Sequence, residues 1–198
     1  MKKKLLFMLA LFCIASFAFA KQYGINVEAA AAYTYHEIYS QPGKDGYNYG
    51  GRIKGSRAYN VGALELGLGY DLPKKWGIYW LGIFGFPSTV DGPKGYIIDS
   101  HFGFGYNFPV AKKFTVFCGG GLAVGGSRIY YSNVFMAYTN IGIGLKATGQ
   151  YMFTDLVGFY FGLSENLLFP VVASSSFSGD LSRFVQSLNA KLGLRFHF

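Results

Sequence analysis

The last ten residues of the chain, NAKLGLRFHF (189–198), alternate strictly between apolar and polar side chains. A period of two residues indicates a β-strand, whose successive side chains point to opposite faces. One face of this strand carries Ala190, Leu192, Leu194, Phe196 and Phe198. The other face carries Asn189, Lys191, Gly193, Arg195 and His197. The apolar face requires either a protein core or a lipid bilayer, and the rest of the sequence decides between the two.

The composition favours a β-protein that exposes apolar side chains to lipid. Hydrophobic residues make up 51% of the 198 residues and charged residues only 14%, against roughly 25% charged in a typical globular domain. The 28 glycines, 16 tyrosines and 20 phenylalanines suit strands and turns better than helices. A soluble barrel coats its exterior with charge, and this chain has too few charged residues to cover eight strands.

Residues 1–20 form a predicted secretory signal peptide. Lysines at positions 2–4 precede an apolar run and the motif Ala18-Phe19-Ala20, which has the pattern of a cleavage site. We therefore expect a signal peptide over 1–20 and a single barrel domain over 21–198. Removal of the three lysines lowers the formal net charge from +8 to +5. The mature chain keeps one cysteine, Cys118, which excludes an intrachain disulfide and lies on the apolar side of its segment.

The two-residue period recurs along the chain. Seven further segments lie at 25–36, 62–70, 76–86, 96–108, 114–126, 140–151 and 157–166. The alternation is less clean in two of them, because 76–86 is apolar on both faces and 114–126 is rich in glycine throughout. Each is about as long as the roughly 9–11 residues that a tilted membrane strand needs, and no segment after residue 20 has the roughly 18 apolar residues of a membrane helix. Short connections at 71–76, 108–114 and 153–156 alternate with longer ones at about 37–57, 87–95, 128–138 and 169–183. This pattern predicts an all-β fold, an eight-stranded antiparallel up-and-down transmembrane β-barrel.

The terminal Phe198, with Phe196 and Leu194 at alternating positions before it, resembles the C-terminal signature of bacterial outer-membrane proteins. In strand number and size, residues 22–198 are similar to the small eight-stranded outer-membrane proteins, the OmpX/OmpW-like group. The resemblance implies a monomer surrounded by lipid in the outer membrane of a diderm bacterium. It also implies that Phe198, Phe196 and Leu194 are an assembly signal, because in that group the barrel-assembly machinery recognises the last strand.

Most charged residues of the predicted strands share a face with glycines, as the interior of a narrow barrel requires. This lumen cluster comprises Glu28, Glu65, Asp99, His101, Lys146, Lys191 and Arg195. Asp99 and His101 are expected somewhat higher in the barrel than the other five residues. We expect the two remaining acids to pair with the three bases, because an unpaired buried charge costs several kcal/mol. The cluster is either a polar plug, since eight strands leave room only for side chains, or the lining of a gated path for small solutes.

The inward face predicted for 76–86 is apolar, with Tyr79, Leu81 and Ile83. These residues either pack against the plug or guide a hydrophobic solute, as the resemblance to OmpW-like proteins allows. The sequence leaves both interpretations open.

A lipid-modifying enzyme is the third alternative. Some eight-stranded barrels modify lipid A with a histidine, a serine and an acid near the outer rim, and His36, Asp99 and Ser100 lie near the tops of their strands. The alternation points Ser100 outward, however, and the strands of His36 and Asp99 are not neighbours, so we expect no enzymatic activity. Histidines and acids are too sparse for a metal site, no glycine-rich sequence forms a phosphate loop, and no cofactor is expected.

The first long connection is basic. It carries Lys44, Arg52, Lys54 and Arg57 against the single acid Asp45, with interleaved tyrosines. It either contacts an anionic surface polymer, such as lipopolysaccharide or a host polyanion, or is simply a solvated loop; nucleic acid is not an expected partner at this location. The sequence thus predicts a non-enzymatic outer-membrane barrel with a polar-plugged lumen and surface loops for interaction.

Overall fold

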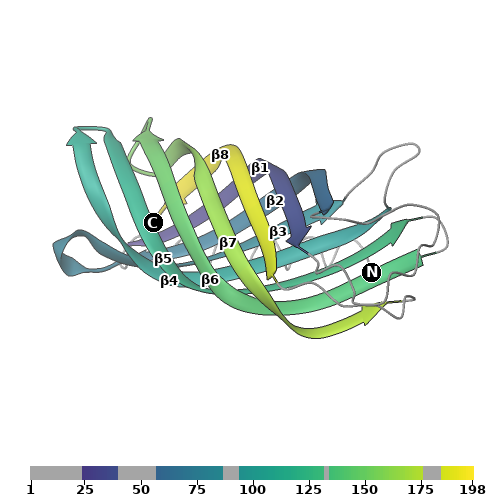
Figure 1. The fold of residues 1–198 in the computed structure, drawn as a ribbon. Helices are drawn as coiled ribbons and strands as arrows, with labels where there is room; N and C mark the ends of the chain where they lie inside the picture. Colours follow the sequence, from purple (N-terminus) through teal and green to yellow (C-terminus); the bar gives the residue numbers. More distant parts are fainter. Residues whose placement is uncertain (1–23, 40–56, 87–93, 132–133, 176–183) are drawn as a thin grey trace, which may run out of the picture.

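The computed structural model describes residues 24–39, 57–86, 94–131, 134–175 and 184–198. Within these ranges the chain forms eight strands and one short 3-10 turn, η1 (Pro73–Lys75). The strands are β1 (Ile25–Tyr39), β2 (Arg57–Asp71), β3 (Trp76–Phe86), β4 (Lys94–Ala111), β5 (Phe114–Tyr131), β6 (Val134–Met152), β7 (Val157–Ser175) and β8 (Phe184–His197). Each strand pairs antiparallel with the next, and β8 pairs with β1 to close the barrel (Figure 1). The predicted fold class is confirmed.

The short connections and the C-terminus lie at one end of the barrel (Figure 1). We call this the short-turn end; β1, β3, β5 and β7 end at the opposite end. The prediction of a long connection over 128–138 is wrong, because β5 and β6 stay paired as far as Tyr131 and Val134. Polar residues such as Arg128 interrupt the apolar alternation there, but the backbone ladder does not depend on apolar side chains.

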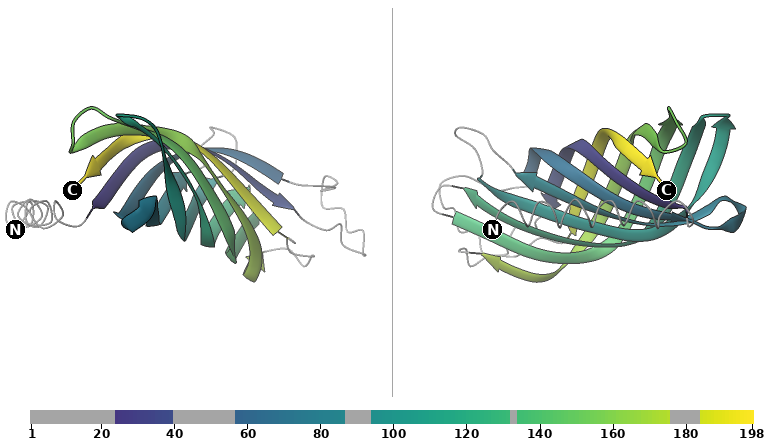
Figure 2. Two further views of the ribbon diagram at one scale, coloured as in Figure 1. Left: turned by 90° about the vertical axis from the view of Figure 1, so that its left-hand side faces the viewer. Right: turned by 180° about the vertical axis from the view of Figure 1, so that it is seen from behind.

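The strands differ in length around the barrel. The four from β4 to β7 have 18 or 19 residues, whereas β3 has 11. A tilted strand crosses the hydrocarbon layer in roughly 9–11 residues, so the longer strands extend beyond it. Figure 2 shows this uneven wall from two further sides.

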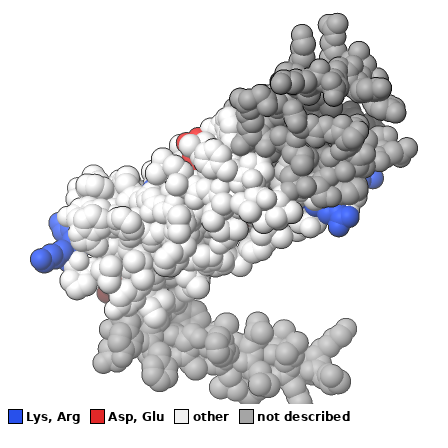
Figure 3. Space-filling view, turned by 60° about the horizontal axis from the view of Figure 1, so that its bottom comes forward, with Lys and Arg blue, Asp and Glu red and all other residues white. Residues whose placement is uncertain are grey.

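The outer face of the wall is apolar and the inner face holds the charges. Leu64 and Leu192 are 63% and 61% exposed, whereas Glu65, next to Leu64 in the chain, is 0% exposed. On the face in Figure 3, Lys and Arg gather at the two ends, and the band between them is almost free of charge. The separation into an outward apolar face and an inward polar face, predicted from the alternation, is therefore confirmed along the strands, with Phe198 as an exception. Among the described residues, no helix has the length and apolar content needed to cross a membrane.

Aromatic side chains gather on the outer face near the short-turn end. The Trp76 ring packs edge-on against Tyr106, with centroids 5.4 Å apart, and the Tyr151 ring lies 5.7 Å from that of Phe153. Amphipathic rings at this level form the aromatic girdle of membrane barrels, where their polar atoms reach the headgroups.

The pairing of β1 with β8, the seam that closes the barrel, extends to Phe198 at the end of the chain. The Ile25 and Phe198 backbones exchange two hydrogen bonds, of 3.0 and 2.8 Å. The sequence places Phe198 on the outer apolar face with Leu194, yet Leu194 is 49% exposed and Phe198 only 8%. Phe198 lies beyond the end of β8 and is tied across the seam to Ile25, so the strand alternation no longer sets its environment.

Candidate functional site

The lumen contains a layer of buried ion pairs, formed by Glu28, Glu65, Lys146, Lys191 and Arg195, which we call the ion-pair layer. The Lys146 Nζ lies 2.6 Å from Glu28 Oε2, and the Lys191 Nζ lies 2.6 Å from Glu65 Oε2. Arg195 Nη1 lies 2.8 Å from Glu28 Oε1. Lys146 on β6 reaches Glu28 on β1, and Lys191 on β8 reaches Glu65 on β2, so these pairs join strands that are not neighbours. The layer therefore spans the lumen.

Aromatic residues add a hydrogen bond and cation–π contacts to the ion-pair layer. The Tyr160 hydroxyl donates to Glu65 Oε1 at 3.2 Å. The Lys146 ammonium lies 5.2 Å from the centre of the Tyr79 ring and 5.7 Å from that of Phe117, within the range of cation–π attraction. Sequence reasoning placed Tyr79 in the lumen but did not single out Tyr160 or Phe117, although Tyr160 lies on the inward face that the alternation predicts.

Toward the short-turn end the network continues through Asp71, which was also missed. Its carboxylate accepts hydrogen bonds from the side-chain amides of Asn26 and Asn107, at 3.0 and 3.2 Å. Arg195 Nη2 lies 3.8 Å away from the same carboxylate. A cavity of about 20 Å³ remains among Asn26, Glu28, Asp71 and Arg195. That volume holds about one water molecule.

The middle of the lumen is polar but contains no further ion pair among the described residues. His36 Nδ1 lies 2.6 Å from Ser187 Oγ, and His101 Nε2 lies 3.0 Å from the Tyr79 hydroxyl. Asp99 is 1% exposed, and both of its carboxylate oxygens lack a hydrogen-bond partner. All seven residues of the predicted lumen cluster thus point inward and are buried. Five of them pair, whereas Asp99 and His101 lie outside the ion-pair layer.

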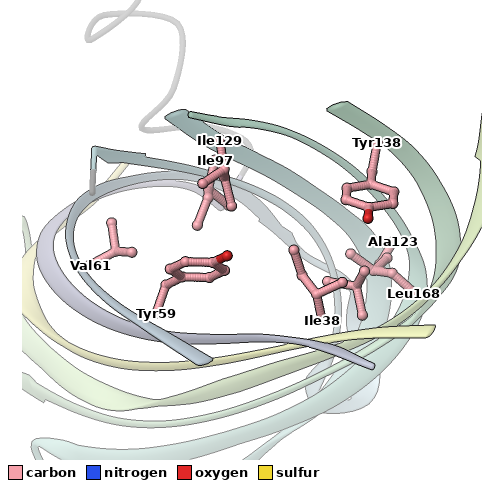
Figure 4. Packing of buried hydrophobic residues seen from close by; sticks show 9 residues of the cluster. Ile38, Tyr59, Val61, Ile97, Ala123, Ile129, Tyr138 and Leu168 are labelled. Carbon is pink, nitrogen blue, oxygen red and sulfur yellow. The ribbon is translucent and has the colours of Figure 1, made fainter. Parts of the chain in front are cut away.

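Beyond the polar middle, an apolar cluster fills the lumen toward the end opposite the short turns (Figure 4). We call it the apolar cap; it consists of Ile38, Tyr59, Val61, Ile97, Ala123, Ile129, Tyr138, Leu168 and Val185. Five of its members, Ile97, Ala123, Ile129, Leu168 and Val185, have no exposed surface. Sequence reasoning missed the cap because several members lie at or beyond the ends of the predicted segments. The continued alternation of β1 and β4 would have found Ile38 and Ile97.

The apolar residues of β3 pack rather than line a space. Leu81 and Ile83 are both 0% exposed and form a second buried cluster with Tyr79 and Phe117. Of the two interpretations left open by the sequence, the packing role agrees with this burial.

The remaining predicted residues lie elsewhere. Ser100 faces outward, where its hydroxyl accepts a 2.7 Å hydrogen bond from Trp80 Nε1, and Cys118 is exposed on the outer face. Three residues of the basic connection, Lys44, Arg52 and Lys54, lie outside the described residues, and so does the side chain of Arg57; the predicted signal peptide is also outside them. Within the described ranges, no group of three or more His, Cys, Asp or Glu side chains is arranged to hold a metal ion.

A closed antiparallel barrel of eight strands, with an apolar exterior and its charges inside, is the architecture of outer-membrane β-barrels. The chain has this fold. It belongs to the family described as "Domain of unknown function (DUF2715)", whose model matches residues 63–198.

Solved outer-membrane proteins share the fold at low sequence identity. Neisserial surface protein A (NspA) is 16% identical with a TM-score of 0.65, and the match covers 88% of this chain and 97% of NspA. OprG from Pseudomonas aeruginosa is 13% identical with a TM-score of 0.57, covering 88% of this chain and 96% of OprG. A major outer membrane protein from Thermus thermophilus is 11% identical with a TM-score of 0.52, covering 87% and 99%. Comparison with curated sequences gives no match. The predicted resemblance to small outer-membrane barrels is confirmed at the level of the fold.

Proposed function

We propose that this protein is a non-enzymatic, monomeric barrel of the outer membrane, that its lumen is closed, and that its function is carried out by its surface loops. The observation that carries the proposal is the double closure of the lumen. The ion-pair layer crosses the interior, and the apolar cap fills it further along.

The pairing makes the closure stable. Opening a water-filled path through the ion-pair layer would require Lys191 and Glu65, whose side chains are both 0% exposed, to separate. Breaking a buried pair by removing one partner costs about 3–5 kcal/mol. The apolar cap adds a second barrier, because Leu168 and Val185 are fully buried in one apolar cluster inside the barrel.

The arrangement of the histidines supports a non-enzymatic role. In a hydrolytic triad the imidazole lies between the nucleophilic serine and the acid. Here Ser187 lies between His36 and Asp99: its hydroxyl is 2.6 Å from His36 Nδ1, and its side chain approaches the Asp99 carboxylate. Ser187 and Asp99 are also 0% and 1% exposed, so a lipid substrate has no access to them.

The apolar outer surface and the last strand support a proposal for the location and the partners. Outer-membrane lipid surrounds the apolar band, and the barrel-assembly machinery recognises the last strand through Leu194, Phe196 and Phe198. The basic connection with Lys44, Arg52, Lys54 and Arg57 is the segment for an anionic surface polymer. These partners are the working hypothesis for the role of the loops.

Planar-bilayer recording tests the closed lumen. Protein whose folding is verified by a heat-sensitive gel shift is expected to give no reproducible conductance steps. Small steps that change in size in Glu65→Gln or Lys146→Met would instead establish the narrow pore. Mass analysis of outer-membrane lipid incubated with the protein tests the enzyme alternative: lipid products that disappear in His36→Ala or His101→Ala would overturn the non-enzymatic role.

A further inference from the structure

The outer face of β4 and β5 carries four polar side chains at the end opposite the short turns. They are Lys94 and Tyr96 on β4 and Arg128 and Tyr130 on β5, and all four are exposed. The strand register pairs Tyr96 with Arg128 and Lys94 with Tyr130. Directly opposed residues of antiparallel strands have their Cβ atoms about 5 Å apart. Two cations and two phenols therefore form one compact group, which we call the outer cationic patch.

Contacts within the patch hold its members together. The guanidinium carbon of Arg128 lies 5.3 Å from the centre of the Tyr130 ring, within the range of cation–π attraction. Gly95, between Lys94 and Tyr96, has a φ of 148°, and a Cβ added there would collide with the Arg128 carbonyl. Glycine at this position thus lets β4 approach β5 and brings the two cations onto neighbouring strands.

The patch lies at the level of the second membrane interface. Tyr106 belongs to the aromatic girdle at the short-turn end, where its ring packs against Trp76, and Tyr96 is ten positions away on the same strand. A tilted strand crosses the hydrocarbon layer in roughly 9–11 residues. Tyr96 therefore lies where lipid headgroups begin, as tyrosines of membrane proteins commonly do, and Lys94 lies just beyond it.

The wall directly below the patch is apolar and partly open. Ile98 and Val124 are 44% and 49% exposed, and Phe102 and Leu122 are 59% and 64% exposed. Between Arg128 and Val124 the outward position is Gly126, where an added Cβ would meet only the Tyr138 carbonyl oxygen, at 3.6 Å. No side chain fills the space between the guanidinium and the apolar strip.

The charge on this face has one sign. Asp99 is the only acid in β4 and β5, and it is buried inside the lumen. The outer face of these two strands thus has two cations and no carboxylate. Its chemistry is that of an amphiphile receptor, with positive charge at headgroup level and an apolar strip at acyl-chain level.

We propose that the outer cationic patch binds a membrane lipid with an anionic phosphate headgroup, whose acyl chain lies along the strip of Ile98 and Val124. Guanidinium and ammonium groups donate charge-assisted hydrogen bonds to phosphate oxygens, and the hydroxyls of Tyr96 and Tyr130 are further donors. This inference rests on the placement of the barrel in a membrane but not on the role proposed for its loops.

Quenching by brominated lipid at a tryptophan beside the patch tests the site. In a background with Trp76 and Trp80 replaced by phenylalanine, Ile98→Trp is the probe. The barrel is folded into vesicles of phosphatidylcholine and phosphatidylglycerol in equal amounts, with bromine on the chains of one lipid or the other. One Lys or Arg near an anionic membrane surface favours binding by roughly 5-fold. We expect phosphatidylglycerol to be preferred at position 98 by up to roughly 25-fold, since the patch holds two cations.

A second probe separates the patch from a general attraction of the barrel for anionic lipid. Leu192→Trp lies on β8, across the closed barrel from β4, and is 61% exposed. We expect it to be quenched equally by the two brominated lipids. Equal preferences at positions 98 and 192 would overturn the proposal, whereas absence of quenching at both would instead contradict the membrane placement.

Variants of the patch assign the preference to its cations. Arg128→Gln and Lys94→Gln, each with Ile98→Trp, are expected to lower the preference by roughly 5-fold, and Arg128→Lys is expected to keep most of it. Lys112→Gln, which removes an exposed charge at the short-turn end, is the matched control and should change nothing. An unchanged preference in Arg128→Gln and Lys94→Gln would overturn the proposal. Loss of the preference on addition of inorganic phosphate at constant ionic strength would show that the patch takes the free anion and not a lipid.

Discussion

Replacing Glu65 with glutamine tests the energetics of the ion-pair layer. The variant keeps the size of the side chain but removes the only acid within 4 Å of Lys191 among the described residues. The Lys191 side chain then has no carboxylate partner at a position with no exposed surface, so it either stays charged and unpaired or gives up its proton, and both cost free energy. Tyr160 also loses a charged acceptor for its hydroxyl. We expect Glu65→Gln to destabilise the folded barrel strongly.

The magnitude follows from the burial of the pair. Removing one partner of a buried ion pair costs about 3–5 kcal/mol, whereas replacing both partners by neutral groups is often close to neutral. Glu65→Gln and Lys191→Met are each expected to fall in that range. The double variant Glu65→Gln/Lys191→Met is expected to recover most of the loss, which gives a coupling energy of about 3 kcal/mol or more. The exposed control Asp155→Asn should stay within about 0.5 kcal/mol of wild type.

Reversible urea unfolding in lipid vesicles measures these free energies, with the mobility of unboiled samples on gels as an independent check on folding. Additive effects of the two single substitutions would refute the reasoning, because the two groups would then not interact in the folded barrel. A loss below about 0.5 kcal/mol for Glu65→Gln alone, the range of ordinary surface substitutions, would show that water reaches Lys191, and the closed lumen would have to be abandoned.

Three further predictions concern closure, assembly and packing. Gly193→Val should abolish the heat-modifiable form on gels, because a Cβ there meets the Ala29 carbonyl and Ala30 across the seam. The control Gly62→Val should fold normally, since no heavy atom lies within 4 Å of its added Cβ. Equal yields of folded protein from the two variants would contradict the seam contact. Deletion of Phe198 should lower assembly in cells more than Phe198→Ala does, since only the deletion removes both backbone bonds to Ile25, and normal membrane insertion of the deletion would rule out a role for the terminus. Leu168→Ala, in the apolar cap, should cost about 2–5 kcal/mol in urea unfolding and Leu163→Ala much less, because Leu168 is 0% exposed and Leu163 53%; similar losses would show that the cap is not packed.

Most of the fold could be predicted from the alternation of apolar and polar residues, because a two-residue period can be recognised within each segment by itself. It distinguished Leu64 from Glu65 and Leu192 from Lys191 without knowledge of their neighbours. The closed barrel followed from the number of strands and the shortage of charge. The ends of β5, β6 and β7 did not follow, because a backbone ladder continues through polar positions that no longer face lipid.

The partners inside the lumen were harder to predict. That Glu65 pairs with Lys191, and Glu28 with Lys146, depends on the relative heights of strands that are not neighbours. Those heights are set by the stagger of the whole barrel, which no single segment encodes. The sequence placed Asp99 somewhat above the other acids, and in the structure it pairs with Gly125 and takes no part in the ion pairs of Glu28 and Glu65.

Quenching of tryptophan by brominated lipid tests most directly whether the apolar face meets the bilayer and the polar face the lumen. In a background with Trp76 and Trp80 replaced by phenylalanine, Phe104→Trp places the probe at a position that is 62% exposed on the outer face, and Tyr160→Trp places it at one that is 0% exposed within the lumen. We predict strong quenching at position 104 and none at position 160. Quenching at position 160 with none at position 104 would show that the barrel faces the other way, and the membrane assignment would fail.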